Sequence, residues 1–395
     1  MRRRKRGALH EIMTRSITLP TETGALETYR LHEPAHFAVH PNPKCRSVFA
    51  AAHVVANPLA ENCLGAPPIL DWQATLGYRQ YLWSLGLGVA EAMDTAQRGM
   101  GLDWPATKEL IQRSAQAAKS SGSPIVCGAG TDQLAAGQRH PLKTIIEAYL
   151  EQCAWIEQHG AHIVIMASRA LAASAHSPED YYQVYETVLD QTQDRVILHW
   201  LGPMFDPALA GYWGSQDLDA ATTHFISLLT KLQNKVEGVK VSLLDKDREI
   251  ALRRQLPSDV KLFTGDDFNY PELILGDEQG FSHALLGIFD GIAPAASAAL
   301  AALDRGEKNT FLARLNPTVP LARHIFQAPT YYYKTGLVFL AYLNGHQSHF
   351  RMIGGLESAR SIPHLSKLFR LADQAGLLGP GAAERMQCFL TLAGV

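Results

Sequence analysis

The segment Val236-Glu-Gly-Val-Lys240-Val-Ser242 is a short, largely apolar run that contains a single lysine. It is one of eight runs that are rich in Val, Ile, Leu or Ala, most of them bounded by Gly, Pro or Asp. Such runs are typical of strands that are buried on both faces of a parallel sheet. We therefore predict strands over residues 47–55, 88–92, 124–127, 161–166, 195–200, 236–241, 260–264 and 282–288.

Helix signals stand between these runs. Asp103 and Pro105 precede a helical pattern over 106–119, and Ser177-Pro-Glu-Asp180 precedes another. An N-cap residue followed by Pro is a typical helix start. Eight strand-then-helix units predict a (β/α)8 TIM barrel in the α/β class. A doubly wound sheet is the competing architecture, but the sequence contains neither GxGxxG nor GxxxxGK[ST], the phosphate-binding turns expected there.

The two ends of the chain differ from its centre. Residues 1–46 are rich in Pro and Thr and have weak periodicity, so we expect an N-terminal arm that wraps the barrel or a neighbouring subunit. Residues 47–305 are assigned to the barrel and residues 306–395 to a C-terminal helical extension. After the eighth strand, helical patterns cover residues 293–304, 310–327, 332–342 and 363–375.

The composition argues against several function classes. The chain has 36 Lys plus Arg and 38 Asp plus Glu, a formal net charge of −2, which is unlike a strongly basic nucleic-acid binder. Its five cysteines form no CxxC pair, so neither a disulfide framework nor a thiolate zinc site is expected. No apolar run reaches the roughly 18 residues of a membrane span. We expect a cytoplasmic protein with no nucleic-acid or membrane partner.

The chain opens with the basic segment Met-Arg-Arg-Arg-Lys-Arg-Gly, which no apolar stretch follows, unlike a secretory signal. We expect a disordered extension, or an over-long start in which Met13 is the true initiator. A tail that binds nucleic acid or membranes is the alternative.

Lys240 is the most informative residue for function. The active site of a (β/α)8 barrel lies at the C-terminal ends of its strands, and Lys240 lies near the end of the sixth predicted strand. Burial in a strand lowers the pKa of an ammonium group, and a partly neutral lysine can attack a carbonyl and form a Schiff base. The alternative is a structural ion pair with Glu237, Asp266 or Asp267.

The segment around Lys240, followed by Leu262-Phe-Thr-Gly-Asp-Asp267, resembles the dihydrodipicolinate synthase and N-acetylneuraminate lyase superfamily. The pattern of that superfamily is I-x-G-x-K-[DE]-x-S and then a strand that ends G-D-[DE]. Pro124-Ile-Val-Cys-Gly-Ala-Gly130 is similar to its P-V-I-A-G-x-G segment, and Ala328-Pro-Thr-Tyr-Tyr-Tyr-Lys334 is loosely similar to its N-P-x-P-x-K segment. The resemblance spans about residues 47–345, in the same order along the chain.

The resemblance implies a (β/α)8 barrel and class I aldolase chemistry that uses no cofactor. It implies that Lys240 forms the Schiff base and that Gly265 and Asp267 hold hydroxyl groups of a sugar-like substrate. It places Thr95 on the second threonine of the G-T-T-G-E loop, which cradles the carboxylate of a 2-oxo acid. It also implies a homo-oligomer, either a dimer or a tetramer.

The pocket around the lysine departs from the family pattern. The G-T-T-G-E loop is here Met93-Asp-Thr-Ala-Gln97, so both glycines are lost and Asp94 would repel a carboxylate unless Arg98 or another cation intervenes. The proton-relay tyrosine after the fourth strand falls on Arg169 or Ser168. The fifth strand has His199-Trp-Leu-Gly-Pro203 in place of Y-N-x-P. We expect a side branch that kept the lysine and rebuilt the pocket.

His199 and Arg169 are the candidates for the rebuilt chemistry. His199 is the predicted acid/base, because an unperturbed imidazole pKa of about 6.5 suits both roles; the alternative is a core histidine that bonds a carbonyl. Arg169 is predicted to hold a carboxylate or phosphate of the substrate, and its alternative is an ion pair with Glu91 or Asp94.

Three carboxylates are predicted to accept hydrogen bonds from hydroxyl groups of a substrate, those of Asp94, Asp267 and Glu91. His53 lies at the end of the first predicted strand and joins the candidate binding residues. An ion pair between Glu91 and Lys240 is the alternative for Glu91, and it would keep the lysine charged and prevent nucleophilic attack.

We therefore predict a class I (Schiff-base) aldolase-type lyase or dehydratase that acts on a small-molecule carbonyl substrate, a 2-oxo acid or keto-sugar derivative. No cofactor and no metal are expected. One alternative is a divalent-metal-dependent sugar isomerase or aldolase with ligands from His53, Glu91, Asp94, His199 and Asp267. Another is a non-catalytic barrel. The tyrosines at 331–333 are interpreted as packing residues between barrel and extension or across a subunit contact, and stacking on the substrate is the alternative.

Overall fold

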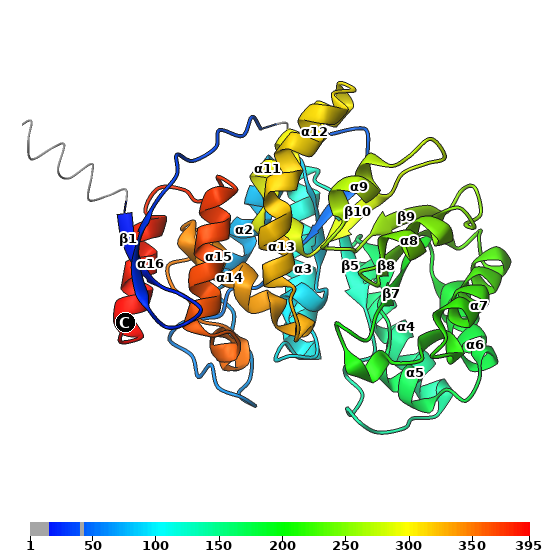
Figure 1. The fold of residues 1–395 in the computed structure, drawn as a ribbon. Helices are drawn as coiled ribbons and strands as arrows, with labels where there is room; N and C mark the ends of the chain where they lie inside the picture. The colour runs from blue at the N-terminus through cyan, green and yellow to red at the C-terminus, as the bar shows by residue number, and fades with distance from the viewer. Residues whose placement is uncertain (1–15, 40–42) are drawn as a thin grey trace, which may run out of the picture.

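Eight parallel strands close into a barrel in the order β10-β3-β4-β5-β6-β7-β8-β9 (Figure 1). The computed structural model describes residues 16–39 and 43–395, so the basic segment at the start of the chain lies outside the described residues. Each strand overlaps one of the predicted strands, which confirms the (β/α)8 prediction. The strands are β3 (Val48–Ala51), β4 (Gly88–Glu91), β5 (Ile125–Ala129), β6 (His162–Ile165), β7 (Val196–Leu201), β8 (Val236–Ser242), β9 (Lys261–Thr264) and β10 (His283–Leu286).

The strands direct alternate side chains into the barrel and outward to the helices. Ala51, Ala90 and Phe263 belong to an apolar cluster of inward-facing residues. Val239 and Val241 of β8 belong instead to the large cluster that includes the surrounding helices. Because successive strand residues face opposite sides, Lys240 between these two valines faces the barrel interior.

Ten helices follow the strands and cover the barrel. Asp71, Asp103 and Asp217 cap α2, α3 and α7, and each accepts a hydrogen bond from a backbone N–H of the first turn. The helices are α2 (Trp72–Ser84), α3 (Trp104–Ser121), α4 (Leu142–Gln158), α5 (Arg169–Ser174), α6 (Pro178–Gln191), α7 (Leu218–Lys231), α8 (Lys246–Arg253), α9 (Tyr270–Leu275), α10 (Ile288–Gly291) and α11 (Ala293–Asp304).

The C-terminal part of the chain adds α12 (Lys308–Leu315), α13 (Val319–Ile325), α14 (Tyr333–Leu343), α15 (Ile362–Gln374) and α16 (Ala382–Leu392). The prediction of one helix over 310–327 is wrong, because the turn η4 (Asn316–Thr318) separates α12 from α13. Pro317 lacks a backbone N–H and cannot continue the hydrogen-bond ladder of α12. Helix α16 was not predicted.

Helix α14 is the central helix of this C-terminal part. All 11 of its residues are buried, and it packs against α10, α13, α15 and α16. Its first residues, Tyr333 and Lys334, line a cavity together with Asp94 and Arg98, which follow strand β4. The packing of α14 therefore delivers two polar side chains to the C-terminal end of the barrel.

The N-terminal residues form a hairpin that packs on the C-terminal helices. β1 (Ser16–Pro20) pairs antiparallel with β2 (Leu26–Arg30), and β1 contacts α15 and α16. Figure 1 shows this hairpin beside α16, away from the barrel. The weak periodicity of residues 1–46 did not predict a hairpin. Among the described residues, no helix is both long and apolar enough to span a membrane.

Candidate active site

Lys240 lies on the inner side of β8 with only 6% of its surface exposed. Burial lowers the pKa of its ammonium group, and the charges of Asp94 and Asp267 partly oppose that shift. Within the described part of the chain, Lys240 makes no ion pair. The glutamate expected as one partner, Glu237, binds Lys261 at 2.8 Å instead.

Gly265 provides the space that Lys240 occupies. It follows β9, and a Cβ atom at this position would lie 2.9 Å from Cε of Lys240 and 2.8 Å from the carbonyl oxygen of Val241. Any larger residue would therefore displace the lysine or the strand. Gly265 therefore lies directly against the lysine side chain.

Asp267 and Asp94 are the acidic side chains that act on Lys240. Asp267 accepts a hydrogen bond from the backbone N–H of Ile288 at 2.8 Å. Burial raises the pKa of its carboxyl group to about 7, although the Ile288 bond and the Lys240 charge oppose the shift. Its neighbour Asp266 instead accepts hydrogen bonds from the backbone N–H groups of Phe268 and Asn269, in the turn that precedes α9. Alternation of successive residues explains the different roles.

His199 lies beside Lys240, because the register of β7 and β8 pairs these two residues. Its Nε2 atom lies 3.1 Å from Oγ of Ser242, and its Nδ1 atom is buried with no hydrogen-bond partner among the described residues. Burial and then the charge of Lys240 hold its pKa well below the usual imidazole value. The premise of an ordinary histidine pKa is therefore wrong, and the ring is neutral near pH 7.

Thr95 and Tyr333 contribute a pair of hydroxyl groups to the site. Thr95 lies in the 3-10 turn η1 (Asp94–Ala96) after β4, and its Oγ1 atom lies 2.9 Å from the Tyr333 hydroxyl. The Tyr333 ring stacks on Phe326 with centroids 4.4 Å apart. Burial, followed by the charge of Asp94, raises the pKa of Tyr333 well above its usual value.

The sequence favours a packing role for Tyr333. In the structure its hydroxyl also contacts Thr95, and the charges of Asp94 and Asp267, the same two that act on Lys240, help to raise its pKa. No local sequence signal marks this role, because the place of Tyr333 at the site depends on how the buried helix α14 packs against the barrel.

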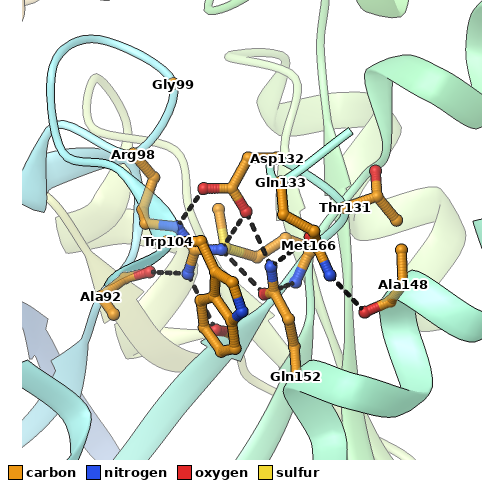
Figure 2. A network of polar contacts seen from close by, with 12 residues as sticks. Ala92, Arg98, Gly99, Trp104, Thr131, Asp132, Gln133, Ala148, Gln152 and Met166 are labelled. Atoms are coloured by element: carbon orange, nitrogen blue, oxygen red, sulfur yellow. Dashed lines mark hydrogen bonds and ion pairs between the residues drawn. The ribbon is translucent and has the colours of Figure 1, made fainter. Parts of the chain in front are cut away.

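Arg98 does not screen Asp94 as the sequence suggested. Its Nε atom donates to Asp132 at 2.8 Å, Nη1 donates to the carbonyls of Ala92 and Gly128, and Nη2 donates to Gln152 at 2.8 Å. Figure 2 shows these bonds converging on one guanidinium between the loops after β4 and β5. The network fixes the two loops and leaves Arg98 saturated.

Arg169, at the start of α5, pairs with Asp206 rather than with Glu91 or Asp94. A longer contact of 3.4 Å joins Nη1 to the carbonyl oxygen of Gly99. Its side chain is 41% exposed and lines the cavities described below, so it remains a candidate for binding an anion.

Glu91 and His53 do not join the site. Glu91 alternates to the outer face of β4, where its two oxygens accept hydrogen bonds from Arg79 at 2.8 and 2.9 Å. The ring of His53 lies 2.8 Å from Asp290, and both side chains are fully buried. The predicted contacts of Glu91 and His53 with substrate are therefore wrong, because internal partners hold both groups away from solvent.

Two adjoining cavities open beside these residues. One, of about 180 Å³, lies against residues 130–138 and 166–170, and the other, of about 240 Å³, lies against Tyr333 and Lys334. Asp94, Arg98, Arg169 and Asp206 line both. Lys240 lines neither cavity. Asp94 lines both cavities, and its charge acts on Lys240. In residues 16–39 and 43–395, no group of three or more His, Cys, Asp or Glu side chains could hold a metal ion.

Comparisons with known proteins agree with this fold. The family described as "Protein of unknown function (DUF993)" matches residues 17–395. No curated protein sequence matches the chain. The dihydrodipicolinate synthase of Aquifex aeolicus is similar in structure, with a TM-score of 0.63 at 13% identity over 85% of this chain and 99% of that one.

Two further solved structures give the same result. The dihydrodipicolinate synthase of Thermotoga maritima has a TM-score of 0.62 at 17% identity over 86% of this chain and 100% of that one. The chloride-inhibited enzyme of Acinetobacter baumannii, solved in complex with pyruvate, has a TM-score of 0.62 at 15% identity over 85% and 100% of the two chains. The resemblance predicted from the lysine segment is thus confirmed as a shared fold.

Proposed function

This chain belongs to the family described as "Protein of unknown function (DUF993)", and we propose that it is a class I, Schiff-base-forming aldolase or dehydratase for a 2-oxo acid or keto-sugar derivative. The observation that carries the proposal is Lys240. It is a buried lysine without an ion-pair partner among the described residues, at the C-terminal end of a barrel strand. Its lowered pKa favours the neutral amine that attacks a carbonyl.

Imine formation at Lys240 defines the first step. The neutral Nζ atom forms a bond to the carbonyl carbon, and the carbonyl oxygen takes up a proton to give a carbinolamine. Loss of the amine proton and departure of that oxygen as water leave a C=N bond, which becomes an iminium when protonated. The iminium then accepts the electron pair of a C–C or C–H bond that breaks next to it.

Asp267 and Tyr333 are the groups we assign to proton transfer. A carboxyl group whose pKa is about 7 exists in both protonation states near neutral pH, which suits a group that gives and takes a proton. The Tyr333 hydroxyl stays protonated and bonds Thr95, so it can donate to the departing oxygen. The neutral ring of His199 contacts the hydroxyl of Ser242 and orients it, and the ring lies beside Lys240.

The metal-dependent alternative has less support than the Schiff-base proposal. Two of its five predicted ligands, His53 and Glu91, are held by Asp290 and Arg79.

The similar structure from Acinetobacter baumannii contains pyruvate, a 2-oxo acid. That likeness supports pyruvate as the first carbonyl compound to test on this chain.

The test is borohydride reduction in the presence of pyruvate and a panel of keto-sugars, followed by peptide mass mapping. We expect a stable adduct on Lys240 and its loss in Lys240→Ala. Lys261→Met is the matched control, because Lys261 lies on the neighbouring strand β9 and pairs with Glu237. The proposal would be overturned if no compound gave an adduct on Lys240. It would also be overturned if the adduct formed unchanged in Lys240→Ala.

A further inference from the structure

Two basic side chains from distant parts of the sequence line the 240 Å³ cavity beside the proposed site. Lys334 comes from the first turn of α14, and Arg169 comes from the first turn of α5. Lys334 is only 4% exposed, which is uncommon for a lysine unless its charge has a partner. The residues that the structure describes meet only part of the hydrogen-bonding capacity of this pair.

The ammonium group of Lys334 has N–H donors that are available to a ligand. Its Nζ atom donates to the carbonyl oxygen of Tyr331 at 3.1 Å and lies 4.5 Å from the centroid of the Tyr333 ring. An ammonium group has three N–H donors, so the Tyr331 bond leaves two for another acceptor. The backbone carbonyl and the ring hold the ammonium in place without neutralising it.

Arg169 also keeps donors for a ligand. Its Nε atom donates to Asp206, and Nη1 makes only the 3.4 Å contact with Gly99. No hydrogen bond from Nη2 is present within the described residues. Asp206 is engaged on both sides, because it also accepts from the backbone N–H of Ala208 at 3.1 Å.

Two further charged residues, Arg98 and Asp94, line the cavity. Arg98 is saturated by Asp132, Gln152 and two backbone carbonyls, so it adds no free donor. Asp94 is the carboxylate that acts on both Lys334 and Lys240. The cavity therefore offers cationic donors at Lys334 and Arg169 and an acceptor at Asp94, whose charge also acts on Lys240.

We propose that Lys334 and Arg169 bind an oxyanion, a carboxylate or a phosphate, at the end of the substrate remote from the carbonyl that reacts with Lys240. Asp94 then accepts from a hydroxyl group between the two ends. The substrate class is a carbonyl compound with an anionic tail and an intervening hydroxyl. The assignment of the reacting end rests on the proposed function, whereas the oxyanion site stands on the cavity itself.

The state of Lys334 agrees with this assignment. Burial lowers the pKa of its ammonium group to about 8, while Asp94 opposes the shift. The group is thus mostly cationic at pH 7, and a bound anion would raise its pKa further.

The experiment is calorimetric titration of the full chain at pH 7 and low salt with two probes, inorganic phosphate and glutarate. We expect saturable binding of at least one probe, weakened at least 10-fold by Lys334→Met and by Arg169→Gln. Lys334→Arg should retain binding, because it keeps the charge. Lys246→Met is the control, because Lys246 forms an exposed pair with Glu272. Tighter phosphate binding identifies a phosphorylated tail, and tighter glutarate binding identifies a carboxylate.

Two results would overturn the oxyanion site: neither probe binds the wild-type chain, or both neutral variants bind as the wild type does. A loss in Lys334→Met counts only when its thermal unfolding remains cooperative. Endpoint borohydride trapping with saturating pyruvate and with each compound of the keto-sugar panel separates the two proposals. An adduct on Lys240 without anion binding would remove the oxyanion site alone, and anion binding without an adduct would remove the Schiff-base proposal alone.

Discussion

At the scale of single residues, the fit between Gly265 and Lys240 gives the sharpest prediction. Gly265→Ala places a methyl group against Oγ of Ser242, 2.8 Å from the carbonyl oxygen of Val241 and 2.9 Å from Cε of the lysine, so the lysine or the end of its strand must shift. We expect borohydride trapping on Lys240 to fall at least 10-fold while the chain stays folded. Gly77→Ala in α2 is the control, because its Cβ would have no neighbour within 4 Å. Equal trapping in both variants would contradict this account.

Glu249 gives a prediction about pH. It is buried, and burial raises its pKa to about 8, while hydrogen bonds from Ser282 and Thr264 oppose the shift. The unfolded chain releases this proton near pH 4.3. Glu249 therefore stabilises the fold fully below that pH, and its contribution is lost as pH rises towards about 8.

Glu249→Gln removes this titration. We expect the free energy of unfolding in urea to rise by about 1–3 kcal/mol at pH 8.5 relative to the wild type, and to change by less than about 0.5 kcal/mol at pH 4. Glu237→Gln should show no such pH dependence, because its partner Lys261 is 40% exposed and surface pairs contribute little. A Glu249→Gln variant that is less stable at both pH values would disprove the assignment.

At the scale of elements, α14 decides whether the tyrosine at its start takes part in the chemistry. Tyr333→Phe removes the hydroxyl that bonds Thr95 and leaves the ring stacked on Phe326. We expect the exchange of pyruvate methyl protons with deuterated solvent, which reports enamine formation, to slow by about 10²–10⁴-fold. Tyr332→Phe, one residue earlier, should exchange at the wild-type rate. An unchanged rate in Tyr333→Phe would return Tyr333 to a packing role.

The elements also show how far the sequence could predict the site. Every barrel strand is an apolar run with turn residues around it, so local pattern was sufficient to place all eight. The same alternation along β4 places Glu91 beside Val89, on the face that packs against helices, and could have excluded Glu91 from the site. Tyr333 and Lys334 were beyond local pattern, because their approach to Asp94 depends on how a wholly buried helix packs against the barrel.

At the scale of the whole molecule, the N-terminal hairpin supports the C-terminal helices that carry half of the proposed site. The carboxylate of Asp373 on α15 accepts from the Tyr29 hydroxyl at 2.8 Å and from the backbone N–H of His32 at 3.0 Å. Asp373 is only 4% exposed. These bonds fasten the hairpin to α15, which packs directly against α14.

Asp373→Ala tests this fastening. Loss of the buried acceptor removes the partner of the Tyr29 hydroxyl and of both the backbone N–H and the ring Nδ1 of His32, so we expect the free energy of unfolding to fall by about 1–3 kcal/mol and trypsin to cleave faster after Arg30. Glu27→Ala, which breaks only the exposed pair between Glu27 and Arg370, should change stability by less than about 1 kcal/mol. If the hairpin merely covers α15, endpoint trapping on Lys240 stays at the wild-type level in Asp373→Ala. If the hairpin holds α14 in place, the deuterium exchange that depends on Tyr333 slows in parallel with the increase in cleavage, and we expect this second outcome because α15 connects the hairpin to α14.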